Sequence, residues 1–254
     1  MIALFNTVLY DPILNLLLWV RTILPGGDLG IAIILVTILI KLLLMAPSYA
    51  AIRSQKALQD IQPKVDALRA KYKKDQQTLS REMIQLYRTN KVNPLSSCLP
   101  LLIQFPILIA LYQVFLSGIR DVDGATGLLG AGQLAHLYEP LRTVYASMPI
   151  PTDFLGLVSL TAPSILFAVL AAGFQFWQGR MLLARRKTPQ PSNSTAAMMN
   201  RNMLYLAPGL ALVFGVTLPA GLTLYWIVST LFTIGQQYVF LRHAEKRDAT
   251  PAPS

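Results

Sequence analysis

The chain has 254 residues, of which 54% are hydrophobic and only 13% are charged. Soluble domains carry about 25% charged residues, so this composition predicts an integral membrane protein with several spans. The single cysteine, Cys98, excludes an internal disulfide, and two histidines without a histidine–carboxylate motif argue against a metal enzyme. We therefore expect neither a metal nor a cofactor.

The first 24 residues contain an apolar run that three polar side chains interrupt. Such a run is too short to span a bilayer, so we expect an amphipathic helix in the external interface, with Tyr10 and Trp19 at the membrane surface. A Pro-Gly-Gly sequence ends this segment, and Asp28 can cap the helix that follows. The three interrupting residues are Asp11, Asn15 and Arg21.

The stretch from Gly30 to Pro47 reads GIAIILVTILIKLLLMAP, and Lys41 is its only charged residue. Its apolar residues leave no wet face, so we expect a buried or membrane helix, with a length of roughly 27 Å. An ammonium there costs about 2.5 to 3.5 kcal/mol on insertion scales. Two interpretations stay open: the side chain extends to the nearby interface, or it lines a polar cavity inside the protein. Thr37, one turn earlier on the same face, favours the polar lining.

Residues 50–93 carry ten basic and four acidic residues. Apolar residues at helical spacing in 61–72 and 79–86 predict two helices, with Pro63 in the first turn of one and a connection near 73–77. We therefore expect a basic antiparallel helical hairpin outside the membrane. The alternative is a solvated loop that only sets the topology. The candidate contact residues of the hairpin are Lys64, Arg69, Lys71, Lys73, Lys74 and Arg81.

The later apolar segments each contain a few polar or aromatic residues. CLPLLIQFPILIALYQVFL has two prolines, which should kink it, and Gln104 as its buried polar residue. The segment that ends in FQFWQGRM places Gln175 and Gln178 about one helical turn apart, and the last segment contains Tyr225 and Trp226. These residues are the candidates for a polar lining within the membrane.

The distribution of positive charge predicts the topology. Eighteen of the 22 Lys and Arg residues fall in segments on one side and three on the other, which predicts an external N-terminus and a cytoplasmic C-terminus. The expected parts are an external interfacial helix (1–27), the first span (28–49), the cytoplasmic basic hairpin (50–95), the second span (96–117), an external loop (118–154), the third span (155–178), a cytoplasmic loop (179–202), the fourth span (203–218), the fifth span (219–240) and a cytoplasmic tail (241–254).

Apart from Asp28, which can cap the first span, the predicted spans contain no Asp or Glu and no nucleophile–base pair. This argues against an enzyme, against proton-coupled transport and against intramembrane proteolysis. The residues leave three classes open. One is a protein with a membrane cavity that holds one positive charge beside a basic cytoplasmic hairpin, another is a small transporter or channel for an anionic solute, and the third is a structural subunit that assembles other membrane proteins.

Several motifs resemble the YidC-type membrane protein insertase family, within the YidC/Oxa/Alb superfamily, in its short bacterial form. They are GIAIILVTILIKLLLMAP, then NPLSSCLPLLIQFPILIALYQVF after the basic hairpin, then FWQGRM and LPAGLTLYWIVSTLFTIGQQ, and they cover nearly the whole chain in the family's order. The resemblance implies an all-α protein with five transmembrane helices around a hydrophilic groove that is open to the cytoplasm and the lipid. It also implies insertion and folding of nascent membrane proteins, with a chaperone role, in the plasma membrane of a bacterium.

The resemblance also implies site residues and partners. Lys41 occupies the position of the family's usual arginine, a departure that keeps the charge but loses the planar fork. The implied partners are nascent membrane proteins and membrane lipids, with the ribosome, the signal-recognition particle and its receptor, and a Sec-type translocon as further candidates, and no specific nucleic acid. The implied groove residues are Thr37, Lys41, Gln104, Gln178, Tyr225 and Trp226, to which the spacing adds Gln175.

Overall fold

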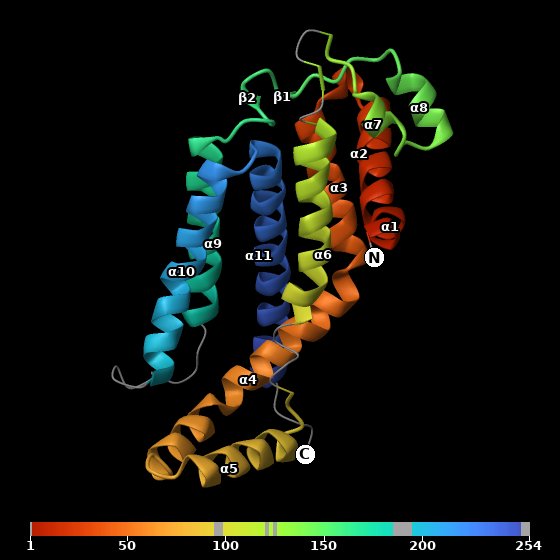
Figure 1. The fold of residues 1–254 in the computed structure, drawn as a ribbon. Helices are drawn as coiled ribbons and strands as arrows, with labels where there is room; N and C mark the ends of the chain where they lie inside the picture. The colour runs from red at the N-terminus through yellow and green to blue at the C-terminus, as the bar shows by residue number, and fades with distance from the viewer. Residues whose placement is uncertain (1, 94–98, 120–121, 124–125, 185–194, 250–254) are drawn as a thin grey trace. The chain divides into compact units, whose positions relative to one another are not determined.

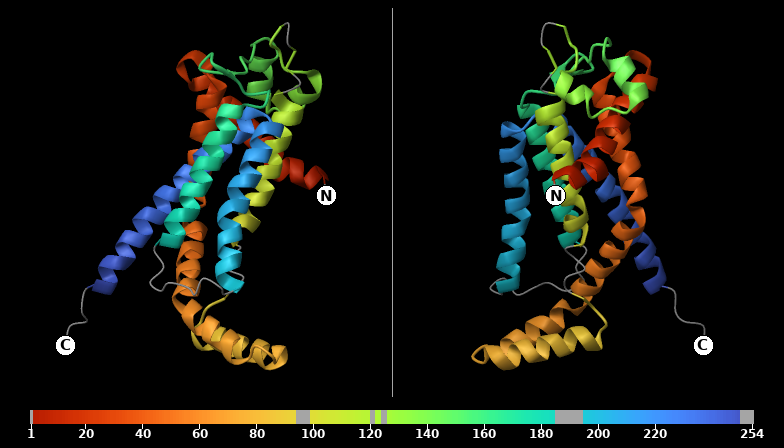
Figure 2. Two further views of the ribbon diagram at one scale, coloured as in Figure 1. Left: turned by 90° about the vertical axis from the view of Figure 1, so that its left-hand side faces the viewer. Right: turned by 45° about the vertical axis from the view of Figure 1, so that its right-hand side comes forward.

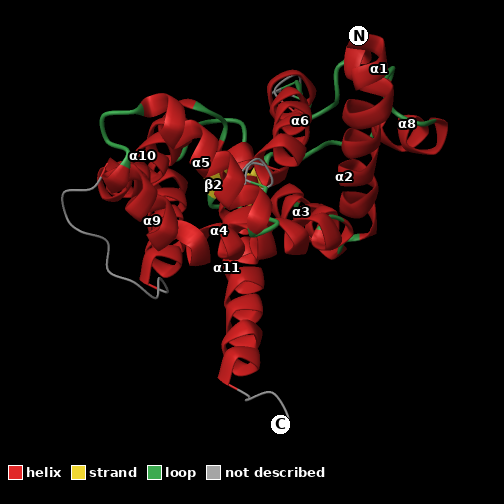
Figure 3. Ribbon diagram, turned by 90° about the horizontal axis from the view of Figure 1, so that it is seen from below, coloured by secondary structure: helices red, strands yellow, loops and turns green. Residues whose placement is uncertain are grey.

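A computed structural model of the protein describes residues 2–93, 99–119, 122–123, 126–184 and 195–249. Most of this part of the chain is helical (Figure 3). The strands β1 (Asp153–Phe154) and β2 (Val158–Ser159) of this part of the chain form one small antiparallel sheet. The prediction of an all-α protein is confirmed at this level, whereas the count of five spans and the groove stay predictions.

The chain forms two compact units, and four of its described helices contribute residues to both. The first unit comprises Met1–Leu43, Ile103–Gln175 and Pro208–Phe232, and the second comprises Leu44–Leu102, Phe176–Ala207 and Thr233–Ser254. In chain order the helices are α1 (Ile2–Phe5), the π-helix η1 (Asn6–Tyr10), α2 (Asp11–Ile23), the 3-10 helix η2 (Pro25–Gly27), α3 (Leu29–Leu43), α4 (Met45–Lys71), α5 (Gln76–Thr89), α6 (Leu99–Gln113), the π-helix η4 (Val114–Ile119), α7 (Ala131–Leu134), α8 (Glu139–Tyr145), α9 (Ile165–Ala184), α10 (Thr195–Thr217) and α11 (Ala220–Ala249).

The N-terminal helical run is longer than the sequence suggested. Consecutive helices cover Ile2 to Ile23, and Ala3–Ile23 is long and apolar enough to cross a membrane. The argument that this segment is too short to span was therefore wrong, because its polar residues do not interrupt the helix. Among the described helices, Leu29–Leu43 reaches such a length only together with Met45–Leu58. The interfacial position of the N-terminal helix stays a prediction.

Two polar residues of α2, Asn15 and Arg21, are buried against the loop around α7 and α8, which lies beside α2 in Figure 1. The Arg21 guanidinium donates from Nη1 to the Tyr145 hydroxyl at 3.1 Å and from Nη2 to the Pro149 carbonyl at 2.9 Å. Asn15 donates to the His136 carbonyl at 2.9 Å and accepts from the Tyr138 amide at 2.7 Å. These hydrogen bonds satisfy the Asn15 amide and both terminal nitrogens of Arg21, which would be costly to bury alone, and they fix α2 to this loop.

The beginning of α3 is tied to β1. As predicted, Asp28 caps the helix, because its Oδ1 accepts from the Ile31 amide at 2.9 Å. Its Oδ2 accepts from the Leu155 amide at 2.6 Å. Gly30 lies against the Phe154 ring so closely that a Cβ atom at this position would clash with it. One carboxylate and one glycine thus join two segments that are more than 120 residues apart in the chain.

The predicted first span, 28–49, is not one helix. α3 ends at Leu43 and α4 begins at Met45, with non-helical angles at Leu44. Pro47 explains the break, because its ring would clash with the carbonyl of Leu43, four residues earlier, and it has no N–H to donate.

The predicted hairpin corresponds to α4 and α5, which contact each other in the second unit (Figure 2). We expected Pro63 in the first turn of a helix, but it lies inside the 27-residue α4. Its ring is exposed, while Ile61 and Val65 on either side are buried. Burial of these neighbours compensates for the missing backbone hydrogen bond, so the helix continues.

The base of α4 packs on the last part of α11 within the second unit. Ser48 donates to Gln236 at 3.1 Å, the Tyr49 and Phe240 rings meet edge to face at 4.8 Å, and Ile52 is buried against Phe240.

Three other boundaries differ from the predictions. α9 begins at Ile165 instead of residue 155, because the intervening segment contains the β1–β2 turn. α10 already begins at Thr195, within the predicted cytoplasmic loop, and α11 continues through the predicted tail to Ala249. Cys98 and most of the predicted linker TPQPSNSTA lie outside the described residues, as do residues 250–254.

We predict that Asp75→Ala loosens the beginning of α5. Asp75 accepts from the Thr78 hydroxyl at 2.6 Å and from the Thr78 amide at 3.0 Å, and these hydrogen bonds lower the pKa of its carboxyl. The cap therefore stabilises the helix at neutral pH, and its contribution is lost as the pH falls through this lowered pKa. Hydrogen–deuterium exchange at pH 7 should be several-fold faster for the amides of residues 76–79.

Ser80→Ala, an exposed substitution in the same helix, is the control and should leave the exchange unchanged. Equal exchange in Asp75→Ala and the unmodified protein would show that the cap contributes nothing.

Candidate functional site

Lys41 and Thr37 lie one turn apart on α3, in the first unit. Thr37 is fully buried, and its hydroxyl donates to the Ile33 carbonyl of the same helix at 2.6 Å. The hydroxyl proton is therefore used within α3, and only the oxygen lone pairs can serve another group. Lys41 is half-buried, so its ammonium is neither free in solvent nor sealed in a core.

A chain of hydrogen bonds joins Lys41 to two other helices of the same unit. Lys41 Nζ donates to Gln104 Oε1 on α6 at 3.2 Å, and Gln104 Nε2 donates to the Tyr225 hydroxyl on α11. Tyr225 is only 2% exposed. The structure thus brings together three of the predicted groove residues, from sequence positions up to 184 residues apart, into one polar cluster, the Lys41 cluster.

The positive charge of the Lys41 cluster is not neutralised by a carboxylate. Among the described residues, none of the salt bridges includes Lys41. Its one hydrogen-bond partner in this part of the chain is the neutral amide of Gln104, although an ammonium has three protons to donate. The cluster can therefore attract an anionic or carbonyl-bearing group.

The other predicted groove residues lie outside this chain of hydrogen bonds. Trp226 is half-buried, and its ring lies 6.0 Å from that of Phe214. Gln175, the last residue of the first unit on α9, accepts from the Thr230 hydroxyl at 3.4 Å. Gln178 is half-buried in the second unit, and the hydrogen bonds of Lys41 do not include it. A role for Gln175, Gln178 and Trp226 in a groove stays a prediction.

Sequence reasoning missed the hydroxyl residues of α11. Thr223, Ser229 and Thr230 are buried, and the Ser229 hydroxyl shares a hydrogen bond with Tyr225. The spacing could have indicated them. Ser229 follows Tyr225 by four residues, and Thr230 follows Trp226 by four residues, so each hydroxyl residue lies one turn after a predicted groove residue on the same helix face. Small hydroxyl residues are common in apolar helices, however, and their burial partners are decided by tertiary packing.

The basic residues of the hairpin are a second candidate surface. Lys64, Lys73, Lys74 and Arg81 are exposed, and Arg69 is half-buried. The Lys71 ammonium lies 4.9 Å from the centroid of the Tyr72 ring, and the interaction with Tyr72 raises the pKa of Lys71. Among the described residues, no carboxylate forms a salt bridge with any of these six side chains, so their charge is available to a partner.

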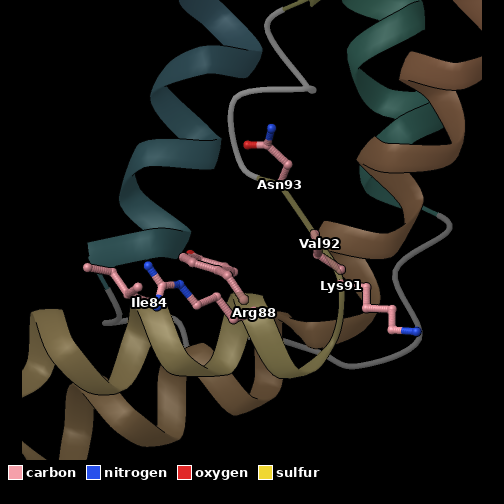
Figure 4. Close-up of a pocket in the computed structure, with 6 residues that line it drawn as sticks. Ile84, Arg88, Lys91, Val92 and Asn93 are labelled. Atoms are coloured by element: carbon pink, nitrogen blue, oxygen red, sulfur yellow. The ribbon is translucent and has the colours of Figure 1, made fainter.

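An open pocket of about 400 Å³ lies at the end of α5 (Figure 4). Its apolar wall is formed by Ile84, Tyr87 and Val92, while Arg88 and Lys91 supply positive charge. The Lys91 side chain points away from Arg88 in Figure 4, so the two cations do not converge on one point. The pocket extends the basic surface of the hairpin and is wide enough for a side chain of a partner.

Comparison with known proteins gives a consistent result. A sequence model of the 60Kd inner membrane protein family matches residues 19–247. A Clostridium tetani protein named membrane protein insertase YidC is 33% identical over 89% of this chain and 87% of its own length. A Fusobacterium nucleatum protein of the same name is 32% identical over 85% of this chain and 87% of its own length. A longer Bordetella petrii protein, also of that name, is 30% identical over 95% of this chain but only 36% of its own length.

A double-mutant cycle should show that Gln104 and Tyr225 are coupled. Gln104→Leu and Tyr225→Phe each remove one partner of the same hydrogen bond, so their effects on the free energy of unfolding should not add. We expect a coupling energy of about 0.5 to 1.7 kcal/mol, the range measured for such bonds in membranes, from unfolding titrations in detergent micelles.

The control cycle combines Gln104→Leu with Thr217→Val, since the exposed Thr217 hydroxyl bonds only within its own helix among the described contacts. Additive effects in both cycles would contradict the hydrogen bond between Gln104 and Tyr225.

Proposed function

Since the chain belongs to the 60Kd inner membrane protein family, we propose that it is a membrane protein insertase that inserts nascent membrane proteins and helps them to fold. The observation that carries the proposal is the Lys41 cluster, a positive charge in a strongly apolar helix with a neutral amide as its described partner. Such a charge is costly in a membrane, and charged residues that are kept there usually mark the path of a substrate or an ion.

The proposed architecture has five spans around a hydrophilic groove, open to the cytoplasm and to lipid. The N-terminus is external and the C-terminus cytoplasmic, since eighteen Lys and Arg residues fall on the hairpin side and three on the other. The groove is lined by Thr37, Lys41, Gln104, Gln175, Gln178, Tyr225 and Trp226. The protein lies in the bacterial plasma membrane, as the family description of an inner membrane protein supports.

The mechanism follows from the cost of moving polar backbone through hydrocarbon. Every N–H and C=O group of a translocating tail that lacks a partner costs several kcal/mol in a dry membrane. A polar groove that reaches part of the way across shortens the dry path. Lys41 attracts acidic residues of the tail, and the membrane potential, positive outside, adds about 2.3 kcal/mol per charge for each 100 mV.

The insertion step needs no covalent chemistry by this protein. The hydrophobic segment of the substrate leaves the groove sideways because it partitions into lipid, and this partition drives the reaction. The basic hairpin and its pocket first capture the substrate or a delivery factor, and the candidates are the ribosome, the signal-recognition particle, its receptor and a Sec-type translocon. A transporter for a small anion would explain Lys41 but not the hairpin, for which it has no use.

Substitution of Lys41 tests the electrostatic role. Lys41→Arg should retain insertion activity, whereas Lys41→Ala should slow the insertion of substrates with acidic external tails by about tenfold, because a charge pair near 4 Å is worth about 1 to 4 kcal/mol. Proteoliposomes loaded with the purified protein, and protease protection of the substrate tail, would measure this.

Substrates with neutral tails are the control and should be much less affected. Full activity of Lys41→Glu on acidic tails would contradict the electrostatic role, and the side chain would then only extend to the interface.

Replacement of Pro63–Arg88 by a short Lys/Ser linker of equal charge tests the hairpin. The linker keeps the positive charge that sets the topology, so the topology should be unchanged. It removes the surface formed by α5 and the last third of α4, so insertion should fall several-fold in the same assay.

A matched control exchanges Lys73 and Lys74 for Arg, which keeps both fold and charge. If the linker variant inserted substrates at the normal rate, the hairpin would be a topology signal and nothing more.

A further inference from the structure

The turn between β1 and β2 places a leucine, Leu155, in the left-handed region of backbone conformation. The Leu157 amide donates to the Phe154 carbonyl at 2.9 Å, which closes a β-turn over Phe154–Leu157. The two central residues, Leu155 and Gly156, both have positive φ, 51° and 68°. This is the φ pattern of a type I′ turn, in which Asn, Asp and Gly are preferred at both positions.

Leucine at position 155 is not explained by the turn itself. The left-handed region is unfavourable for a residue with a bulky side chain, and Asn or Gly would close the same turn without this cost. The Leu155 side chain is also not part of the core, because it is 58% exposed, and Leu157 is 84% exposed. Leu155 thus has an unfavourable backbone conformation, and its side chain gains no packing within the chain. This indicates that the exposed side chains of Leu155 and Leu157 contact something outside the chain.

The turn is held in place by the rest of the first unit. The Leu155 amide donates to Asp28 Oδ2, and the Phe154 ring packs on Gly30 at the start of α3. At Gly156, by contrast, an added Cβ atom would meet no heavy atom within 4 Å. The base of the turn is therefore fixed to α3, while its tip projects into open space.

The tip is uncharged and continues into an apolar face. The sequence from Phe154 to Val158 is FLGLV. Shortly afterwards α9 begins with Ile165, which is 75% exposed, and Leu166, which is 59% exposed. The intervening segment is anchored to the start of α11, because the carbonyls of Leu160 and Ala162 accept backbone hydrogen bonds from Gly221 and Ala220. The exposed turn and the exposed apolar start of α9 thus belong to one connected structure.

We propose that the tip of this turn, Leu155 to Leu157, inserts among the acyl chains of the nearer membrane leaflet as an apolar anchor. Under the proposed orientation this is the outer leaflet. Lipid is the partner that fits two exposed leucines without a charged or polar neighbour in the tip, next to a helix whose apolar face is expected to meet lipid. The anchor sets the depth of the start of α3, because the Leu155 amide and Asp28 are joined.

A fluorescence experiment on the full chain tests the proposal. In a Cys98→Ser background, Leu157→Cys is labelled with the environment-sensitive dye NBD, and the protein is reconstituted into phosphatidylcholine vesicles that contain a lipid with a nitroxide near the headgroup. We expect blue-shifted emission and quenching several-fold stronger than for dye at Thr126→Cys, an exposed loop position. The proposal would be overturned if the dye at position 157 showed the emission of a water-exposed dye and no more quenching than the dye at position 126. The tip would then contact either a protein partner or no partner at all.

A second variant separates lipid contact from folding. Leu155→Asn suits the positive φ better and removes the apolar side chain, so the thermal unfolding temperature should be unchanged or higher while quenching at position 157 falls. Leu155→Met keeps an apolar side chain and should retain the quenching. Undiminished quenching in Leu155→Asn would refute the anchor role of Leu155. The quenching and the unfolding temperature are both independent of insertion activity. The lipid anchor can therefore be refuted while the proposed insertase function stands, and the insertase function can be refuted while the lipid anchor stands.

Discussion

One constraint governs the candidate site: a positive charge in an apolar helix must find partners within the protein. The described partner of Lys41 is Gln104, and the amide of Gln104 is in turn oriented by Tyr225. Three helices are therefore linked through side chains that can only be satisfied together. Because these partners are neutral, they orient the ammonium without cancelling its charge. A carboxylate in place of Gln104 would hold the helices at least as well, but it would remove the electrostatic attraction on which the proposed function depends.

The sequence was informative where a residue type contrasts with its surroundings. Lys41 and Gln104 are conspicuous because polar groups in apolar helices need a partner, and the resemblance to the insertase family added Tyr225. That these three meet could not be read from spacing, since they lie on three separate helices. The contacts of Asn15 and Arg21 were hidden for the same reason. In the sequence they interrupt an apolar run and suggest a wet helix face, yet both are buried against residues more than 120 positions later.

Two prolines show why local rules predict the helix boundaries only in part. Pro47 ends α3 within four residues of its own position, as the steric rule requires, whereas α4 continues through Pro63. The difference lies in packing, because Ile61 and Val65 bury their side chains on both sides of Pro63 and keep the helix intact. At the start of α9, the decisive element is the β1–β2 turn, whose leucine at positive φ carries no turn signal in the sequence.

The neutral partners of Lys41 also bear on how this protein is itself made. Gln104 and Tyr225 are synthesised 63 and 184 residues after Lys41, so in the proposed topology α3 meets the bilayer before its polar contacts exist. Its eleven Leu, Ile and Val residues each favour insertion by roughly 0.3 to 0.6 kcal/mol, which together offsets the cost of about 2.5 to 3.5 kcal/mol for one lysine. α3 can thus enter the membrane with its charge still hydrated, and the last hydrogen bond of the cluster closes only when α11 arrives. The site is completed at the end of synthesis, so an unfinished chain does not yet have it.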